Sequence, residues 1–178
     1  MSLATAGRAR GLTVVECCVA LAVAAVLVAL ALPFFGDGWS RRHLAGRAHE
    51  LSADLQYLRT EAVARNRAMH ISLSHDAGGD CYVLHSGDAD ACRCDGDAPS
   101  CEAGAVPVKA VRLPASGPVR LKAHLSSMAF NPVRGNATPM NKFVLRDAKG
   151  REVRHVVSIL GRVQTCTTLT DLDGYPPC

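Results

Sequence analysis

Aromatic side chains are scarce in this sequence, and several catalytic and metal-binding patterns are missing from it. The 178 residues include one Trp, three Tyr and four Phe, so bound nucleic acid would find few rings on which bases could stack. No serine lies in a nucleophile-elbow context, and no regular Asp-x-Asp-x-Asp-Gly loop with a closing Glu is present for calcium. No internal repeat is found. We therefore expect one non-repetitive domain with no enzyme activity, cofactor, metal site or small-molecule substrate.

Charge is almost absent from one stretch near the start of the chain. From Leu12 to Phe35 the single charged residue is Glu16, and a helix of this length would reach about 36 Å, enough to cross a hydrocarbon layer of roughly 30 Å. Two arginines precede the stretch, which favours a cytoplasmic start with the bulk of the chain outside. A plain anchor or a secretory signal fits the same stretch. Ala29-Leu30-Ala31 offers a signal-peptidase site that would leave Leu32 as the N-terminus of a secreted soluble domain.

Glu16 separates these readings. An ionised carboxylate near the start of a spanning helix is costly in lipid and needs a partner, and neither a plain anchor nor a removable signal gains from it. If the chain is cut after Gly11, the new amine of Leu12 lies one helical turn from Glu16, or beside the Glu16 of a neighbouring subunit. Misregister would leave both charges unpaired, so such a pair would fix the register of stacked helices.

The run Gly11-Leu12-Thr13-Val14-Val15-Glu16, followed by a long aliphatic stretch, resembles the class III leader junction of type IV pilins and pseudopilins. The resemblance implies cleavage after Gly11 by a prepilin peptidase and N-methylation of Leu12. It also implies roles in assembly for Thr13, Glu16 and Pro33, the last lying where many of these helices carry a kinking proline. Leu12 departs from the commoner phenylalanine.

A second periodic segment follows. Its apolar residues recur at spacings of 4, 3, 4, 3 and 4, namely Leu44, Ala48, Leu51, Leu55, Leu58 and Ala62. This pattern predicts an amphipathic helix from Arg42 to Arg67 whose apolar stripe packs on the chain's own sheet, with a coiled coil as the alternative. Gly36-Asp37-Gly38, just before it, predicts a bend or a short melted stretch.

Beyond Arg67 the apolar residues alternate with a period of two, which is typical of strands. The predicted strands lie at 69–73, 81–84, 106–113, 119–123, 127–130, 142–146 and 152–159. Asp147-Ala148-Lys149-Gly150 joins the last two as a hairpin. The expected fold is α+β, a long helix packed on antiparallel sheet, in four parts: leader 1–11, membrane and filament-core helix 12–35, bend and amphipathic helix 36–67, and disulfide-bearing β domain 68–178.

Six cysteines in the polar part of an exported domain point to disulfides. A bridge between Cys166 and Cys178 would pin the C-terminal tail with an effect on the order of 3 kcal/mol. Cys92 and Cys94 are too close to bridge each other, which leaves two sets of pairs: Cys81–Cys92 with Cys94–Cys101, or Cys81–Cys94 with Cys92–Cys101. A competing hypothesis places zinc between Cys92, Cys94, Cys101 and His85.

The pilin resemblance continues into the domain. Leu51–Ala62 with Arg65-Asn66, Met128–Gly135 and Ile159–Val163 are similar to segments of the GspH/FimT group of minor pilins. This resemblance implies a low-abundance subunit that assembles into, initiates or caps a type IV pilus or a type II secretion pseudopilus. Its partners would be other pilins and the prepilin peptidase, and it would cross the inner membrane once, with the C-terminal domain in the periplasm or on the filament.

DNA binding is the alternative function. Between Lys109 and Arg162 there are eleven Lys and Arg residues against two acids, and some FimT-like minor pilins are understood to bind DNA through a Gly-Arg-x-Arg motif. Here Gly161-Arg162-Val163-Gln164 keeps Arg162, but Gln164 removes the second charge. Other basic residues could restore the phosphate contact, and the candidates are Lys149, Arg151 and Arg154.

Overall fold

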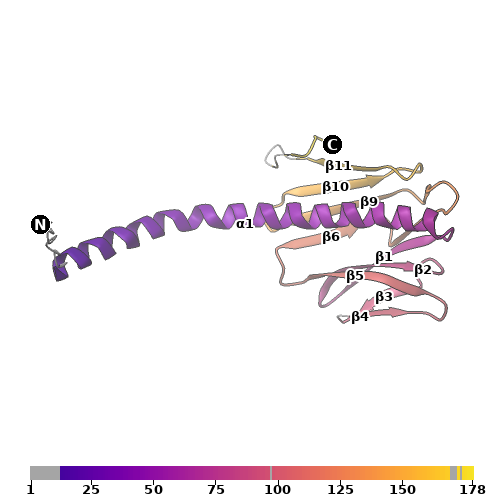
Figure 1. Ribbon diagram of the computed structural model, residues 1–178, viewed down its shortest axis with the longest axis horizontal. Coiled ribbons are helices and arrows are strands. Elements are labelled where there is room, and N and C mark those ends of the chain that lie inside the picture. Colours follow the sequence, from indigo (N-terminus) through magenta and orange to yellow (C-terminus); the bar gives the residue numbers. More distant parts are fainter. Residues whose placement is uncertain (1–12, 97, 169–171, 173) are drawn as a thin grey trace, which may run out of the picture. The chain divides into compact units, whose positions relative to one another are not determined.

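The structure, a computed structural model, describes residues 13–96, 98–168, 172 and 174–178, and for residues 31–36 it describes the backbone alone. One long helix, α1 (Val14–Ala64), is followed in these residues by eleven strands (Figure 1). The chain divides into two units, Met1–Trp39 and Ser40–Cys178. The α+β class predicted from the sequence is confirmed.

The first turn of α1 is capped by Thr13. Its hydroxyl accepts the backbone N–H of Glu16 at 3.3 Å, and its carbonyl accepts that of Cys17 at 3.1 Å. These bonds satisfy donors that a helix start leaves unpaired, and the Thr-x-x-Glu order is that of a capping box. In the first unit large apolar side chains are 55–80% exposed, among them Val14, Val15, Val19, Leu21, Val23, Val26, Leu27, Val28 and Leu30.

The backbone of α1 is helical through Gly36-Asp37-Gly38, so the melted stretch expected there is wrong. A glycine weakens a helix by about 1 kcal/mol, but it keeps its N–H and the hydrogen-bond ladder continues. Within the residues that the structure describes in full, no helix has both the length and the apolar character needed to cross a membrane. Leu12 and the side chains of residues 31–35, which belong to the predicted span, lie outside that description.

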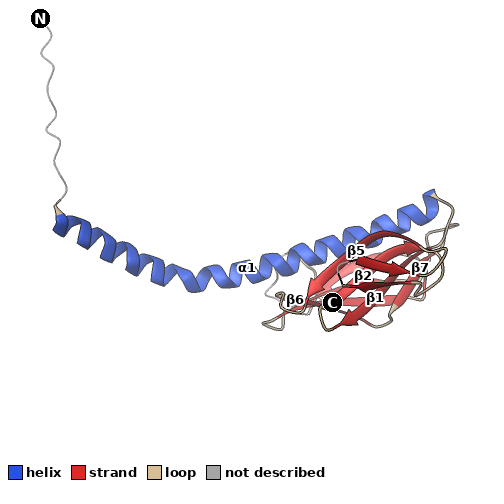
Figure 2. Ribbon diagram, turned by 90° about the horizontal axis from the view of Figure 1, so that it is seen from below, coloured by secondary structure: helices blue, strands red, loops and turns tan. Residues whose placement is uncertain are grey.

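The second half of α1 carries the core of the second unit. All six stripe residues predicted from the spacing are at most 1% exposed, and residues 40–64 lie across the strands (Figure 2). The helix ends at Ala64 because Asn66 takes a left-handed φ of 46°. The N–H of Arg67 then bonds to Ala62 O at 3.1 Å and that of Asn66 to Val63 O at 3.3 Å, the two bonds of a Schellman cap.

The described strands form two larger antiparallel sheets and a ribbon. The first sheet has the order β5 (Val106–Pro114), β2 (Gly79–Ser86), β1 (Met69–Asp76), β7 (Ser127–Phe130) and β8 (Ala137–Thr138). The second has the order β11 (Val163–Thr167), β10 (Glu152–Val157), β9 (Asn141–Asp147) and β6 (Val119–Ala123). The ribbon pairs β3 (Cys92–Asp95) with β4 (Ala98–Cys101).

One apolar core joins the α1 stripe to both sheets, and a buried polar group is built into it. Tyr82 on β2 donates its hydroxyl to Asp54 Oδ2 on α1 at 2.7 Å, and Lys109 Nζ on β5 lies 2.8 Å from both oxygens of the same carboxylate. Burial and the neighbouring Asp54 raise the pKa of Tyr82 far above its ordinary value. These bonds fix where α1 sits on the first sheet.

Every strand predicted from the sequence is confirmed, with ends that differ by a few residues, and so is the β9–β10 hairpin. Four strands were not predicted: β3, β4, β8 and β11. Two of them form the ribbon, whose Cys, Asp, Ser and Pro residues show no alternation of apolar and polar side chains. β8 has two residues, and β11 carries mostly polar ones.

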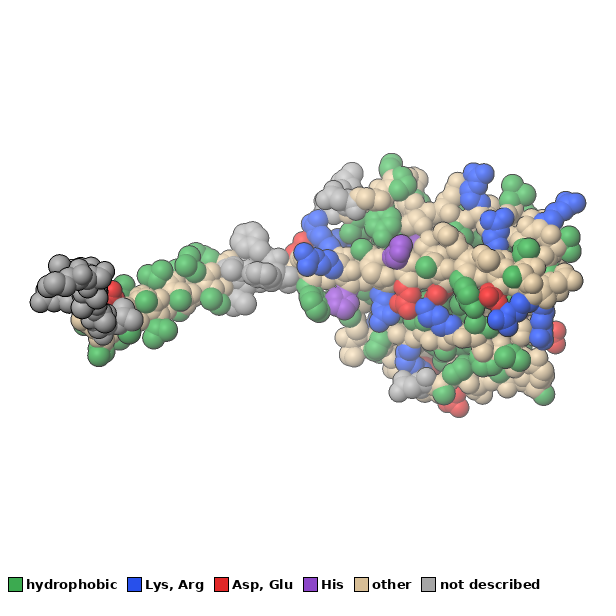
Figure 3. Space-filling model, in the orientation of Figure 1, with side chains coloured by type: hydrophobic (Ala, Val, Ile, Leu, Met, Phe, Trp, Pro, Cys, Tyr) green, Lys and Arg blue, Asp and Glu red, His purple; other side chains and the backbone are tan. Residues whose placement is uncertain are grey.

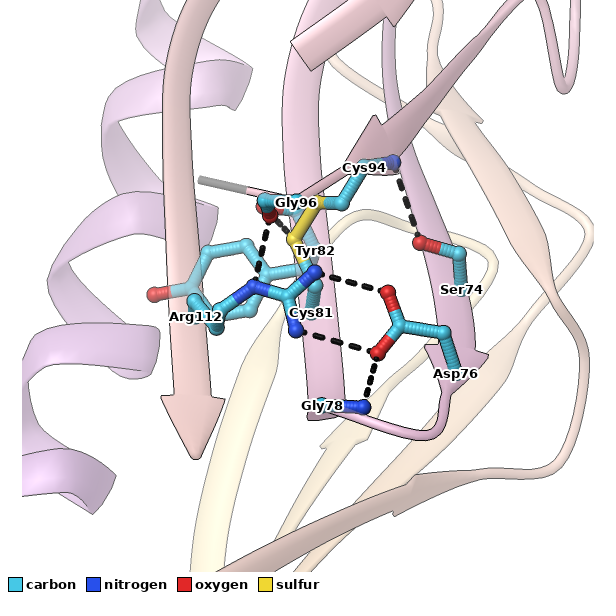
Figure 4. Close-up of a disulfide and its surroundings, with 8 residues drawn as sticks. All are labelled: Ser74, Asp76, Gly78, Cys81, Tyr82, Cys94, Gly96 and Arg112. Atoms are coloured by element: carbon cyan, nitrogen blue, oxygen red, sulfur yellow. Dashed lines mark hydrogen bonds and ion pairs between the residues drawn. A yellow bond between two sulfur atoms is a disulfide. The ribbon is translucent and has the colours of Figure 1, made fainter. Parts of the chain in front are cut away.

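Disulfides hold the ribbon and the tail. Cys81 on β2 bonds to Cys94, Cys92 bonds to Cys101 across the ribbon, and Cys166 bonds to Cys178. The second of the two predicted sets of pairs is therefore the one found, and the zinc hypothesis is wrong because its three sulfurs are bonded to other sulfurs. The ribbon is further held by Arg112, whose guanidinium donates to both oxygens of Asp76 at 3.0 and 2.7 Å and to Gly96 O at 2.7 Å (Figure 4).

Candidate functional site

The predicted processing junction is only partly visible. Gly11 and Leu12 lie outside the described residues. Thr13 and Glu16 are exposed at the start of α1, where Thr13 caps the helix through the N–H of Glu16. Pro33 lies within the continuous helix, and its side chain is not described. The proposed roles of these residues in cleavage and assembly remain predictions.

Arg151, predicted as a DNA contact, has a structural role instead. Its Nε donates to Asp147 Oδ2 at 2.7 Å, and both residues are 4% exposed. Burial alone would raise the pKa of Asp147, but hydrogen bonds from Arg151 and Ser40 favour the carboxylate and bring its pKa below the ordinary value. A DNA phosphate could not reach this guanidinium, so the prediction for Arg151 is wrong.

The other predicted basic residues do not form one surface. Arg154 is engaged with Glu152, its Nη2 lying 2.8 Å from Glu152 Oε2. Lys149 and Arg162 are exposed, but the turns that carry them lie at opposite ends of β10. That strand has six residues, which places its ends roughly 20 Å apart at the usual rise per residue.

The structure instead brings together the three segments that carry the pilin resemblance. Arg59, from the helix segment, donates its Nε to Gly135 O at 3.1 Å and its Nη2 to Leu160 O at 3.5 Å. The N–H of Ala137, two residues beyond the segment that ends at Gly135, bonds to Ile159 O at 2.9 Å and so joins the two loops. We call Arg59, Gly135, Leu160 and Gly161 the motif junction.

Two glycines let the backbones of the motif junction approach each other. Gly135 and Gly161 have φ values of +61° and +73°, a region that side chains rarely adopt. A Cβ on Gly161 would overlap the carbonyl oxygen of Gly135, and a Cβ on Gly135 would lie 2.9 Å from Arg59 Nε. Both positions therefore favour glycine, and at Gly161 the approach of the two backbones leaves no room for a side chain.

Hydrogen bonds fix the two loops that surround these glycines. Asn131 Oδ1 accepts the N–H of Val133 at 2.9 Å, and Asn131 O accepts that of Gly135 at 2.9 Å. In the other loop, Ser158 O accepts the N–H of Gly161 at 2.8 Å, and the N–H of Ser158 donates to Arg162 O at 3.0 Å. Both loops are therefore cross-linked by hydrogen bonds and form platforms for the side chains that they carry.

These platforms expose large apolar side chains, which the sequence had not suggested. Val133 is 76% exposed, Ile159 62%, Leu160 68% and the neighbouring Val63 48%. The sequence signal for this exposed patch was the pair Ile159-Leu160 directly before a glycine. Ile159 had instead been predicted to end a strand. The strand stops at Val157, so both residues lie in the turn.

A comparison with sequence models of known protein families identifies the family of the chain. The sequence model described as "Type II transport protein GspH" matches residues 47–161, well over half of the chain, including the whole motif junction. The chain belongs to the GspH family. Its recognition from the sequence as a type IV pilin-like protein of the minor pilin and pseudopilin group is confirmed.

Two crystal structures of a minor pilin share the fold of this GspH-family chain. The type IV minor pilin FimU of Pseudomonas aeruginosa matches in two crystal forms, with 22% and 21% identity and TM-scores of 0.51 and 0.50. The first match covers 70% of this chain and 88% of FimU, and the second covers 68% and 90%. The minor pseudopilin EpsH of the Vibrio cholerae type 2 secretion system matches with 12% identity and a TM-score of 0.49, over 68% of this chain and 94% of EpsH. No curated protein sequence matches the chain.

Proposed function

We propose that this GspH-family chain is a minor subunit that assembles into, initiates or caps a type IV pilus or a type II secretion pseudopilus. The observation that carries the proposal is the first unit: a helix whose described apolar side chains are exposed and whose first turn carries a carboxylate, Glu16. A helix that is apolar all round requires lipid or other helices around it. Membership of the GspH family supports the same role.

The mechanism follows from charge and packing. Cleavage after Gly11 leaves an amine on Leu12, close to the carboxylate of Glu16. In the inner membrane, and then in a bundle of pilin helices, apolar packing supplies the attraction, and the pairing of this amine with a Glu16 carboxylate supplies the register. Removing one partner of a charge pair in a low-dielectric setting costs several kcal/mol, so misplaced subunits are disfavoured.

The test compares Glu16→Gln with Glu102→Gln in cells that make the filament. Glu102 is exposed at the end of the ribbon, so this control removes one carboxylate without touching the helix. We expect Glu16→Gln to reach the membrane normally and to fall at least about tenfold in the sheared filament fraction, as the loss of a buried charge pair implies. Equal incorporation of both variants would contradict the proposed role of Glu16.

DNA binding is less well supported by the geometry. Arg162 is exposed, but Arg151 is buried and Arg154 is paired with Glu152. In addition, Ile159 and Leu160, next to Arg162, are aliphatic, and aliphatic side chains neither pair with phosphates nor stack on bases as aromatic ones do.

A further inference from the structure

The motif junction carries large apolar side chains that the described part of the chain leaves about half or more uncovered. We call Val63, Val133, Ile159 and Leu160, with Arg134 and Arg162 beside them, the junction surface. The four apolar side chains are 48–76% exposed, and both arginines are exposed as well. Contiguous exposed apolar side chains bordered by polar ones are typical of protein interaction sites.

Hydrogen bonds tie the elements that carry the junction surface to one another. Arg59 links α1 to both loops through carbonyl oxygens at 3.1 and 3.5 Å, and Ala137 links one loop to the other at 2.9 Å. Binding to such a surface forfeits little loop entropy, which favours affinity. Exposed apolar side chains on these turns add nothing to the free energy of folding. A role in binding accounts for their presence.

Charge indicates what the partner brings. Three stretches of chain form and flank the motif junction, namely residues 59–67, 131–136 and 158–162. Together they contain five arginines and one carboxylate, Glu61. That carboxylate is paired with Arg65. Figure 3 shows basic side chains interspersed with apolar ones at the end of the second unit where α1 finishes. If a second copy of the chain presented its own junction surface to this one, arginines would face arginines and repel each other.

We propose that the junction surface docks a different pilin-like subunit through an apolar patch bordered by Asp and Glu carboxylates. The inference rests on the proposed function and names the chemistry of one neighbour. The aliphatic centre would hold the partner, and Arg134 and Arg162 would select it by charge and speed its arrival. DNA is the poorer occupant because it offers no apolar surface to the four aliphatic side chains.

The test places the photo-crosslinking residue benzoylphenylalanine at position 160 of the full chain, in cells with their own filament machinery, and identifies the cross-linked peptides. The control carries the same probe at exposed position 102. We expect position 160, and not position 102, to link to a different pilin-like subunit at a peptide containing Asp or Glu. Adding Ile159→Asp should lower the yield at least about tenfold, as at a central interface residue.

Charge variants complete the test. Arg162→Glu should reduce the yield several-fold, and Lys122→Glu, a charge reversal at an exposed residue of β6, should leave it unchanged. Thermal unfolding of each variant should match the parent chain, because the altered side chains are exposed. A cross-link from position 160 to a second copy, to lipid or to nuclease-sensitive DNA would overturn the inference, and so would no cross-link. If the chain still sediments with filaments in those cases, the proposed function stands; if it is missing from them, the proposed function fails too.

Discussion

At the scale of single residues, His155 is a histidine buried in its neutral form. Its side chain is fully buried on β10, and Nδ1 lies 2.8 Å from the hydroxyl of Thr165. Burial lowers the pKa of His155 to about 4, whereas an exposed histidine in the unfolded chain titrates near 6.5. Below pH 6.5 the unfolded state binds a proton that the folded state does not. The stability from neutral His155 is therefore present above pH 6.5 and lost as pH falls toward 4.

We accordingly expect the free energy of unfolding to fall by about 3 kcal/mol between pH 7 and pH 4 through this side chain. His155→Asn, whose amide can still meet Thr165, should start less stable at pH 7 and lose less on acidification. Urea unfolding at several pH values measures this. His124→Asn, at an exposed position, is the control and should keep the parent's pH dependence; an identical pH dependence for all three chains would refute the assignment.

Gly161 offers a second residue-level prediction with a matched control. Gly161 and Gly150 both have left-handed φ values, +73° and +81°, but a Cβ would meet the Gly135 carbonyl at the first and nothing within 4 Å at the second. Gly150→Ala should cost about 1 kcal/mol, the backbone penalty alone. Gly161→Ala should cost at least about 3 kcal/mol, because the loops must also separate. Denaturant unfolding of both variants decides it, and equal losses would mean that the loops do not meet as described.

At the scale of elements, the end of α1 is set by one residue. Asn66 takes the left-handed position of the Schellman cap, which glycine fills without strain. Asn66→Gly should therefore keep or slightly raise thermal stability, whereas Asn66→Ala should lower it by about 1 kcal/mol. A helix that tolerated both changes equally would have a different end from the one seen.

Helices and strands with a regular spacing of apolar residues could be predicted from the sequence. Elements held by contacts between distant residues could not. The stripe from Leu44 to Ala62 and the hairpin around Lys149-Gly150 follow from local patterns. The ribbon does not, since Cys92–Asp95 and Ala98–Cys101 are joined by the Cys92–Cys101 disulfide and held on β2 by the Cys81–Cys94 disulfide, while Arg112 on β5 binds Gly96 O between them. Sequence spacing restricted the disulfides to two sets, and the register Cys92↔Cys101 selects one of them.

The motif junction shows the same limit for the functional site. The three segments were visible as resemblances, but their meeting depends on Arg59 reaching across 76 residues to Gly135 O. Arg151 illustrates the converse error. Its charge predicted a surface contact, yet the buried Asp147, four residues away at the start of the hairpin turn, binds it.

At the scale of the whole molecule, the chain combines a helix that exposes apolar side chains with a second unit that has its own core. Our proposal assigns the first to the membrane and the filament, and the second to the choice of neighbours. The first assignment requires that residues 1–11 be removed, because the amine that is to pair with Glu16 exists only after cleavage at Gly11.

The most direct test is therefore the intact mass and N-terminal sequence of the chain from membranes of cells with a prepilin peptidase and of cells lacking it. We predict a chain that begins at methylated Leu12 only where the peptidase is present, and that keeps its first eleven residues elsewhere. A chain that begins at Leu32 in both strains would mean that a signal peptidase releases a soluble domain, and would contradict assembly through Glu16.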